Sequence, residues 1–147
     1  MENNLPRGLR NNNWLNIRRN PANKWQGARK TISDFQFEEF VNPIWGIRAA
    51  FCIIKNWLSN KRLRIRTVSQ IITRWAPPTE NDTSAYIETV CKLAECQPNE
   101  VITYASKNTL CRVLRAMAIV ENGQQYKETF LFQYFETAYE YAKKPYV

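Results

Sequence analysis

The sequence predicts a mainly α (α+β) domain of about five helices with one small β-hairpin. After residue 43, apolar residues recur at three- and four-residue steps, which is the period of an amphipathic helix. The chain has 147 residues, and no internal repeat or low-complexity linker divides it. We therefore expect one domain over residues 1–147. The composition, 44% apolar and 23% charged, excludes wholesale disorder.

The sequence of the N-terminal part predicts little regular secondary structure. Residues 1–23 are rich in Asn, Arg and Pro, which is typical of irregular chain, and we expect this segment to pack on the domain. Residues 25–29 and 34–40 are expected to pair as the hairpin, because Phe35 and Phe37 alternate with polar neighbours as in a half-buried strand.

Three helices are predicted next. The first covers about residues 43–59, on an apolar stripe that begins at Ile44. Thr67 is the expected N-cap of a short second helix, which the Pro77–Pro78 pair terminates. The third follows the polar cluster 81–83, and its predicted inner face comprises Tyr86, Val90, Leu93 and Ala94.

Two more helices complete the predicted domain. The fourth covers about residues 106–122, and Gly123 follows it where a left-handed helix stop is expected. The last covers about residues 126–143 as one long aromatic helix, with Phe130, Tyr134 and Tyr141 at helical spacing.

The chain is basic, with 21 Lys and Arg against 13 Asp and Glu and a formal net charge of +8. Basic residues gather in the first 30 positions and again over residues 61–66. Such a surface attracts any polyanion, including nucleic acid, anionic lipid and cell-wall polymers, so charge alone selects no partner. A solvated basic surface without a partner explains the same charge.

The four cysteines lie on helix-patterned segments without C-x-x-C spacing, and the chain contains no histidine. We therefore expect free thiols, in a chain made in a reducing cytosol, and no zinc site. Without histidine, Ser-His-Asp and Cys-His catalysis are excluded. Any enzymatic proton transfer must then use Glu, Asp, Tyr or Lys.

Membrane and targeting signals are not visible in the sequence. The longest uncharged apolar run covers residues 49–54, far short of the roughly 20 residues that a membrane span requires. Residues 1–4 lack the apolar region of a secretory signal. We expect no membrane partner and no signal peptide.

Glu121 is the most informative candidate residue. The fourth predicted helix turns Leu110, Leu114 and Met117 inward, and Glu121 continues this stripe. A carboxyl group there would be partly desolvated and would face the carbonyl end of the helix, and both effects favour its protonated form. A glycosidase general acid needs such a proton near neutral pH. Alternatively, Glu121 turns outward into solvent beside Gly123.

Residues 75–86 form a second candidate cluster, in which two prolines are flanked by acids, hydroxyls and aromatic rings. Aromatic faces stack on sugar C–H groups, and amides or carboxylates bond to sugar hydroxyls. Trp75, Glu80 and Asn81 are therefore candidate sugar contacts. Helix capping explains the same segment, with one residue of 81–83 as the N-cap and Tyr86 in the core.

Several short motifs in the chain form a recognisable set. They are Arg7-Gly8-Leu9-Arg10-Asn11-Asn12-Asn13, Leu15-Asn16-Ile17-Arg18, Trp25-x-Gly27, Gly46-Ile47-Arg48-Ala49, Arg74-Trp75-Ala76-Pro77-Pro78 and Glu121-Asn122-Gly123. Over about residues 7–126 the chain resembles a phage-encoded virion-protein family, and the Trp-Ala-Pro-Pro stretch with the Glu-Asn-Asp after it is the most specific part. The sequence departs from this family at Trp14, where proline is usual.

The order of segments carries a more distant resemblance. Residues 12–17, 25–40, 46–59 and 81–86 follow the order of an Asn-Asn-x-x-x-Ile segment, a Trp-Gly hairpin, an apolar helix and a Tyr-bearing helix after an Asp-containing loop. This order is similar to that of lysozyme-like glucosaminidases and lytic transglycosylases, and it implies a lysozyme-like domain. The Glu-bearing helix comes last here instead of first. We interpret this as a circular permutation, which closely spaced surface termini permit.

The resemblance implies an enzyme that cuts bacterial peptidoglycan. Glu121 would protonate the leaving oxygen of a β-1,4 link between N-acetylglucosamine and N-acetylmuramic acid. An inverting hydrolase needs a second carboxylate about 6.5–9.5 Å away. The candidates, which the sequence does not rank, are Asp82, Glu80, Asp34 and Glu39.

A lytic transglycosylase needs no second carboxylate, because the muramyl 6-hydroxyl attacks its own anomeric carbon. In that case Tyr86, with Asn12 or Asn13, is expected to orient the sugar. Neither mechanism needs a metal or an organic cofactor. The resemblance implies a phage or prophage product made in the bacterial cytoplasm, which acts in the periplasm or cell wall after passage through a holin or delivery within a particle.

Two other functions fit the sequence. A structural virion or tail protein could keep the lysozyme-like scaffold to bind glycan or neighbouring subunits without cleaving, because fold does not imply activity. A nucleic-acid-binding module could use the two basic groups with Trp14, Trp25 and Trp57. Nothing in the chain resembles a known nucleic-acid-binding motif, so nucleic acid is the less favoured partner.

Overall fold

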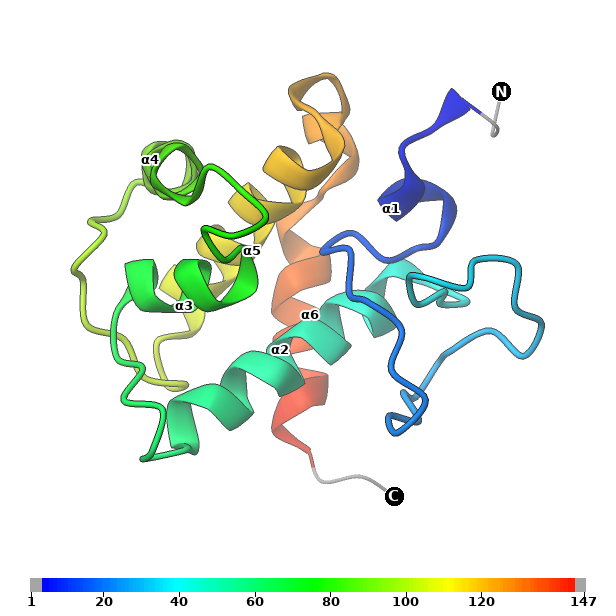
Figure 1. The fold of residues 1–147 in the computed structure, drawn as a ribbon, viewed down its shortest axis with the longest axis horizontal. Helices are drawn as coiled ribbons and strands as arrows, with labels where there is room; N and C mark the ends of the chain where they lie inside the picture. The colour runs from blue at the N-terminus through cyan, green and yellow to red at the C-terminus, as the bar shows by residue number, and fades with distance from the viewer. Residues whose placement is uncertain (1–3, 145–147) are drawn as a thin grey trace.

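The computed structural model describes residues 4–144 and shows a mainly helical protein, as predicted (Figure 1). In chain order the helices are α1 (Arg7–Arg10), α2 (Pro43–Ser59), α3 (Val68–Trp75), α4 (Thr83–Ala94), α5 (Lys107–Asn122), the 3-10 helix η2 (Gln124–Thr129) and α6 (Phe132–Lys143). Residues 1–3 belong to the stretch expected to lack a secretory signal, and they lie outside the described residues.

Helices α2 to α5 lie where the sequence predicts them, and three of them begin at polar caps. The Asn42 side chain accepts a hydrogen bond from the first turn of α2. Thr67 forms a capping box with Gln70 at the start of α3. Asp82 accepts an amide hydrogen bond at the start of α4. Each cap satisfies amides that have no partner within the helix.

Two details of these helices differ from the prediction. Gly123 has a positive φ of 113°, but its ψ of 143° leads the chain away in an extended direction, so it is not a left-handed helix stop. Leu93, predicted on the inner face of α4, is 37% exposed, because the buried face of α4 lies on the neighbouring residues Val90, Cys91 and Ala94.

The prediction of one continuous helix over residues 126–143 is wrong, because the chain breaks between η2 and α6. Phe130 has φ −87° and ψ 72°, and Leu131 has φ −66° and ψ 134°. Phe130 is fully buried against the Trp14 ring, with 4.8 Å between ring centroids. Its carbonyl oxygen accepts a hydrogen bond from Arg115 Nε at 2.6 Å. These tertiary contacts override the local helical pattern.

The predicted hairpin forms only the isolated antiparallel bridge Ala28–Phe40, and no longer ladder is found over residues 4–144. Two carboxylates, those of Asp34 and Glu39, accept hydrogen bonds from backbone amides that would otherwise be available to a strand ladder. Asp34 Oδ1 accepts hydrogen bonds from the amides of residues 36 and 37 at 2.9 and 3.0 Å. Glu39 Oε1 accepts those of residues 33 and 34 at 2.9 and 3.0 Å. Alternation of apolar residues does not reveal this competition.

The N-terminal segment is more ordered and more buried than its composition predicts. It contains the short helix α1, and Trp14 and Leu15 belong to the core at 2% and 0% exposure. Gly8 in α1 packs so closely on the Asn122 side chain that a β-carbon would not fit. Helix α1 therefore packs on the end of α5.

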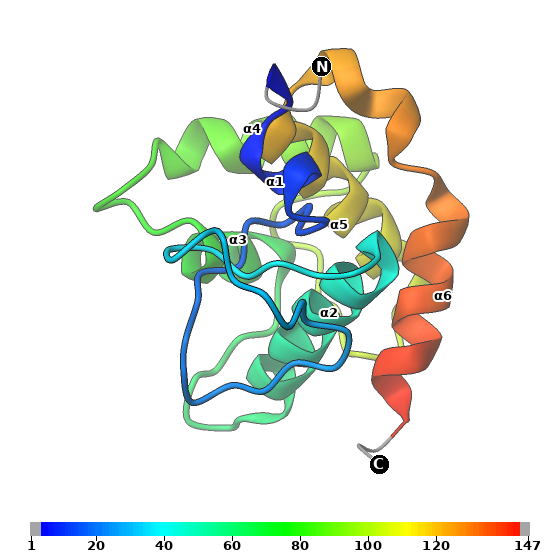
Figure 2. The same cartoon turned by 90° about the vertical axis from the view of Figure 1, so that its right-hand side faces the viewer.

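Helix α5 lies within the fold and contacts α4, α6, η2 and α1. Figure 2 shows α6 running along one side of the molecule, beside α2 and α5. One cluster of buried apolar side chains extends from Trp14 to Ala142. The four cysteines are free thiols, as predicted. In the described part of the chain no helix is long and apolar enough to cross a bilayer.

Candidate active site

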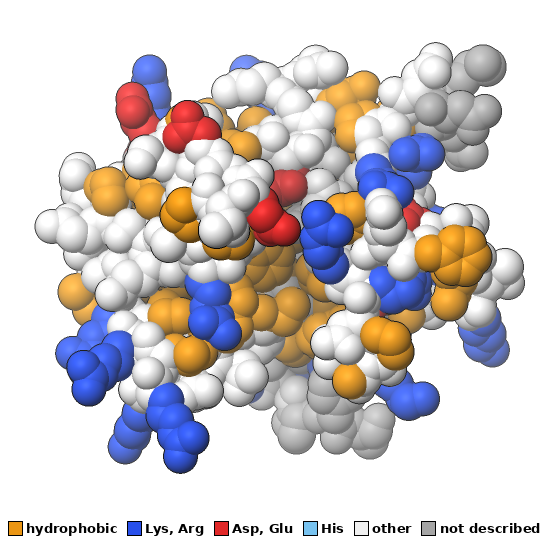
Figure 3. Space-filling model, viewed as in Figure 1, with side chains coloured by type: hydrophobic (Ala, Val, Ile, Leu, Met, Phe, Trp, Pro, Cys, Tyr) orange, Lys and Arg blue, Asp and Glu red, His pale blue; other side chains and the backbone are white. Residues whose placement is uncertain are grey.

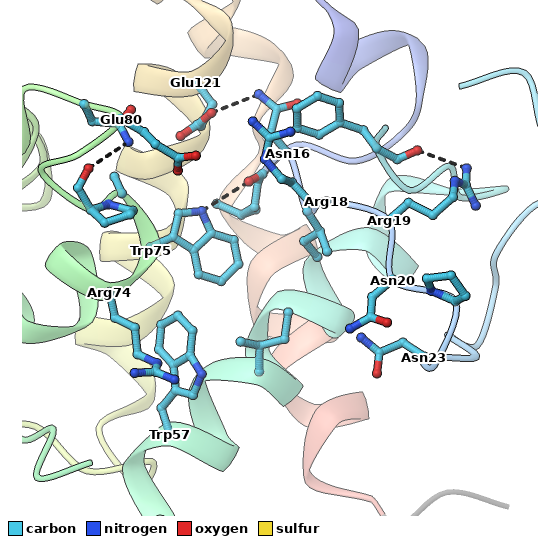
Figure 4. A pocket seen from close by; sticks show the side chains of 18 residues that line it. Asn16, Arg18, Arg19, Asn20, Asn23, Trp57, Arg74, Trp75, Glu80 and Glu121 are labelled. Atoms are coloured by element: carbon cyan, nitrogen blue, oxygen red, sulfur yellow. Dashed lines mark hydrogen bonds between the residues drawn. The ribbon is translucent and has the colours of Figure 1, made fainter. Parts of the chain in front are cut away.

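A groove of about 680 Å³ lies beside the C-terminal end of α5. Its lining comes from the segment after α1, from α2, from the end of α3 and the loop behind it, and from Glu121. Figure 3 shows a hollow in this face with hydrophobic side chains at its floor and both acidic and basic side chains on its rim. In Figure 4, Trp75 lies between Glu121 and the Trp57–Arg74 pair.

Glu121 is half-buried on the wall of this groove, in the last turn of α5. Its Oε1 atom accepts a hydrogen bond from Asn16 Nδ2 at 2.9 Å, and its Oε2 atom accepts one from the Tyr86 hydroxyl at 2.8 Å. Each carboxyl oxygen keeps a second lone pair. The two bonds therefore fix the orientation of the carboxyl group without exhausting its capacity to interact with a ligand.

Tyr86 reaches Glu121 from α4 and is 8% exposed. Burial raises the pKa of its hydroxyl, and the charge of Glu121 and the hydrogen bond to it raise that pKa further. The hydroxyl therefore remains protonated at any physiological pH, and it acts as a permanent hydrogen-bond donor to the carboxyl group.

Asn16 reaches Glu121 from a tight loop that is fastened to the end of α5. Asn16 has φ 53°, a left-handed conformation that asparagine tolerates. The buried Asn122 side chain donates a hydrogen bond to the Trp14 carbonyl oxygen at 2.9 Å and so fixes this loop. The Glu121-Asn122-Gly123 sequence thus supplies a groove carboxyl group, an anchor for the opposite loop and the end of α5.

The groove floor contains two indole rings. Trp75 donates its Nε1 hydrogen to the Leu15 carbonyl oxygen at 3.2 Å, which fixes its ring plane. Trp57 meets Trp75 edge to face, with 5.8 Å between centroids and 64° between planes. Rigid aromatic faces of this kind suit the C–H faces of sugars.

The candidates for a second carboxylate differ in their place relative to the groove. Glu80 lines the groove, as does Asn81, whose amide also donates to the Pro77 carbonyl oxygen at 3.3 Å. Asp82 does not line the groove. Its side chain caps α4 and accepts a hydrogen bond from the Ala85 amide at 3.1 Å, so the capping interpretation holds for it.

Asp34 and Glu39 lie in an ion-paired network of the N-terminal segment and are not groove residues. Burial opposes the charge of Asp34, but hydrogen bonds from Asn11 and from two backbone amides, together with Arg7, outweigh it and lower its pKa to about 2. The pKa of Glu39 is also lowered, since hydrogen bonds from Ser33 and backbone amides and the charge of Arg29 outweigh burial. Both carboxylates are engaged in holding this segment together.

One comparison with known proteins decides the family. The chain is 37% identical over 123 residues to Protein P5 of Pseudoalteromonas phage PM2, and the match covers 82% of this chain and 74% of that protein. The chain belongs to the Protein P5 family. The expected membership of a family of phage proteins is confirmed. No protein-family model matches the chain.

Two asparagines that were predicted to orient the sugar, Asn12 and Asn13, do not line the groove. Asn13 is fully buried, and its amide donates to the backbone carbonyls of Ile17 and Glu38 at 2.9 and 3.0 Å. Asn12 donates to the Phe40 carbonyl oxygen at 3.2 Å. Both amides hold the loop together, and neither residue lines the groove.

Sequence reasoning missed Asn16, Arg18 and Arg74 as groove residues. Asn16 lies in the Leu-Asn-Ile-Arg motif, but its role depends on Glu121, which is 105 positions away in the sequence. The motif itself does not show that this asparagine faces the groove. Arg74 precedes Trp75 in the Trp-Ala-Pro-Pro motif, and that adjacency was the available signal.

Proposed function

We propose that this phage protein is a peptidoglycan-cleaving glycosidase in which Glu121 is the general acid. One observation carries the proposal: the Glu121 carboxyl group is held by Asn16 and Tyr86 on the wall of a groove whose floor is formed by indole rings. A positioned carboxyl group beside a stacking surface is what protonation of a glycosidic oxygen requires.

In the proposed reaction a sugar ring stacks on Trp75, and the Glu121 carboxylic acid transfers its proton to the oxygen of the bond that breaks. The carboxylate that remains keeps the hydrogen bonds from Asn16 and Tyr86, which hold it in place.

The positive charge that develops on the sugar can be quenched in two ways. In an inverting hydrolase Glu80 activates a water, which requires the two carboxyl groups to be about 6.5–9.5 Å apart. In a lytic transglycosylase the muramyl 6-hydroxyl attacks the anomeric carbon, and no second carboxylate is needed. Among the groove residues within the described chain, Glu80 is the carboxylate available for the first mechanism.

The placement of α1 supports a permuted lysozyme-like arrangement. Gly8 in α1 lies against Asn122 at the end of α5. The Glu-bearing helix and the asparagine loop are therefore neighbours in space, as the segment order of the lysozyme-like enzymes requires. In this chain η2 and α6 follow the Glu-bearing helix, and the two ends of the described chain lie apart (Figures 1 and 2).

A non-catalytic virion protein is the second candidate, and the relationship to a phage protein favours it. Large apolar side chains are exposed on the surface, including Phe35 at 82% and Val101 at 71%, and these could contact neighbouring subunits. In both candidates the protein is a phage product made in the host cytoplasm. Only the glycosidase would then act on the cell wall in the periplasm.

Clearing of a peptidoglycan suspension separates the two candidates. We expect the wild-type protein to lower turbidity and Glu121→Gln to slow this by roughly 10²–10⁴-fold, since the amide cannot donate an acidic proton. The exposed Glu88→Gln, on the outer surface of α4, is the matched control and should behave as wild type. Equal clearing by wild type and Glu121→Gln removes Glu121 from its role, and no clearing by wild type favours the virion protein.

A further inference from the structure

The end of the groove away from Glu121 carries an arginine placed over an indole ring. The guanidinium carbon of Arg74 lies 5.2 Å from the centre of the Trp57 ring. Both residues line the groove, and Figure 4 shows them on the far side of Trp75 from Glu121. A ligand that occupies Trp75 can therefore extend onto this pair.

The charge of Arg74 is not matched by an acidic side chain. Among residues 4–144, no Asp or Glu oxygen lies within ion-pair distance of Arg74. Arg19, another groove residue, differs in this respect, because Glu38 and Glu39 both pair with it at 3.2 Å. Arg74 thus presents a cation to the groove, whereas the charge of Arg19 is used within the fold.

This placement suits recognition of a carboxylate. A guanidinium group held over an indole by a cation–π contact keeps its N–H groups available for paired hydrogen bonds to an anion. The contact also restricts the arginine side chain, so less entropy is lost on binding. A neutral sugar polymer offers only hydroxyl and amide groups and gains little from such a cation.

We propose that the Trp57–Arg74 end of the groove is a subsite for the carboxylates of the acidic peptide branch of peptidoglycan. This inference rests on the proposed function and adds a selectivity to it: the protein prefers peptide-bearing glycan over unsubstituted N-acetylglucosamine polymer. The sugar occupies Trp75 beside Glu121, and the peptide branch lies over Trp57 with a carboxylate on Arg74.

Calorimetric titration with two probes tests the subsite, with Glu121→Gln as the background so that no probe is consumed. The probes are chitotetraose, which is neutral, and a disaccharide-tetrapeptide muropeptide, which is acidic. Arg74→Ala should weaken muropeptide binding about tenfold, as expected for loss of a charge-assisted hydrogen bond, and should leave chitotetraose binding unchanged. Arg62→Ala, which removes an exposed arginine outside the groove, should leave both affinities unchanged.

The salt dependence of binding is an independent test of the subsite. Added NaCl should weaken muropeptide binding and leave chitotetraose binding unchanged, because only the muropeptide is charged. An equal loss of both probes on Arg74→Ala, or no loss of either, overturns the subsite. Arg74→Gln repeats the test if the alanine variant melts at a lower temperature. Chitotetraose binding without any preference for the muropeptide refutes the subsite alone, whereas binding of neither probe by any variant refutes the proposed function as well.

Discussion

Asn122 should be a critical anchor of the site, and its isosteric substitution provides a strict test. The buried Asn122 amide donates hydrogen bonds to the carbonyl oxygens of Trp14 and Ala118, each at 2.9 Å. Asn122→Ala removes both bonds and leaves the Trp14 carbonyl without this donor. We expect a loss of about 1–3 kcal/mol in the free energy of unfolding, the usual cost of a buried unsatisfied group.

Asn122→Asp keeps the shape of the side chain but turns the donor into an acceptor. A carboxylate oxygen would then face two carbonyl oxygens in a buried position, and the cost should be about 3–5 kcal/mol at pH 7. Because this environment disfavours the charged form, the pKa of the introduced carboxyl group should be raised. The penalty should therefore shrink as the pH falls through that folded-state pKa toward the unfolded-state value of about 4.

Urea unfolding at pH 7 and pH 5 measures both effects. The expected order of stability at pH 7 is wild type, then Asn122→Ala, then Asn122→Asp, with the gap between the two variants narrower at pH 5. Exposed Asn60→Asp, in the α2 C-cap position, controls for the added charge. If Asn122→Asp is as stable as Asn122→Ala at pH 7, the side chain does not donate to the Trp14 loop as described.

Two further predictions concern the N-terminal segment. Trp14→Ala should lower the free energy of unfolding by about 3–5 kcal/mol, because the ring is 2% exposed and packs on Phe130 and Phe135. A loss below about 1 kcal/mol in urea unfolding would contradict this packing. The ionised Asp34 carboxylate should also stabilise the fold, because its pKa is about 2 in the folded protein against an ordinary value of 3.8. Its contribution to the free energy of unfolding should be at most about 2 kcal/mol, since solvent screens its pairing with exposed Arg7. This contribution should be present above about pH 4 and lost as the pH falls toward 2. The difference in urea midpoint between wild type and Asp34→Asn should therefore narrow between pH 5 and pH 2, and an unchanged difference would refute the role of the ionised carboxylate.

Sequence patterns predicted the parts of the fold that local chemistry controls. The Thr67 capping box and the Asp82 cap place α3 and α4, because a side chain and amides within one helical turn decide where each helix begins. The break at Phe130 could not be predicted in this way, since Arg115 captures its carbonyl oxygen and Trp14 packs on its ring. Both partners lie at least 15 positions away in the sequence.

The site shows the same division between local and distant contacts. Glu121 and Trp75 could be singled out from helical periodicity and motif composition, and both line the groove. The choice of asparagine could not be made locally. Asn13 and Asn16 have the same side chain, but long-range contacts bury Asn13 under Glu38 and turn Asn16 toward Glu121.

The central claim is that the Glu121 carboxyl group breaks a glycosidic bond. Mass spectrometry of the soluble fragments released from purified peptidoglycan, by wild type and by Glu121→Gln in parallel, tests it most directly. We expect wild type to release disaccharide-peptides, with reducing ends if Glu80 activates water or anhydro ends if the muramyl hydroxyl attacks, and Glu121→Gln to release almost none. Fragments of the same kind and amount from both proteins would contradict the claim.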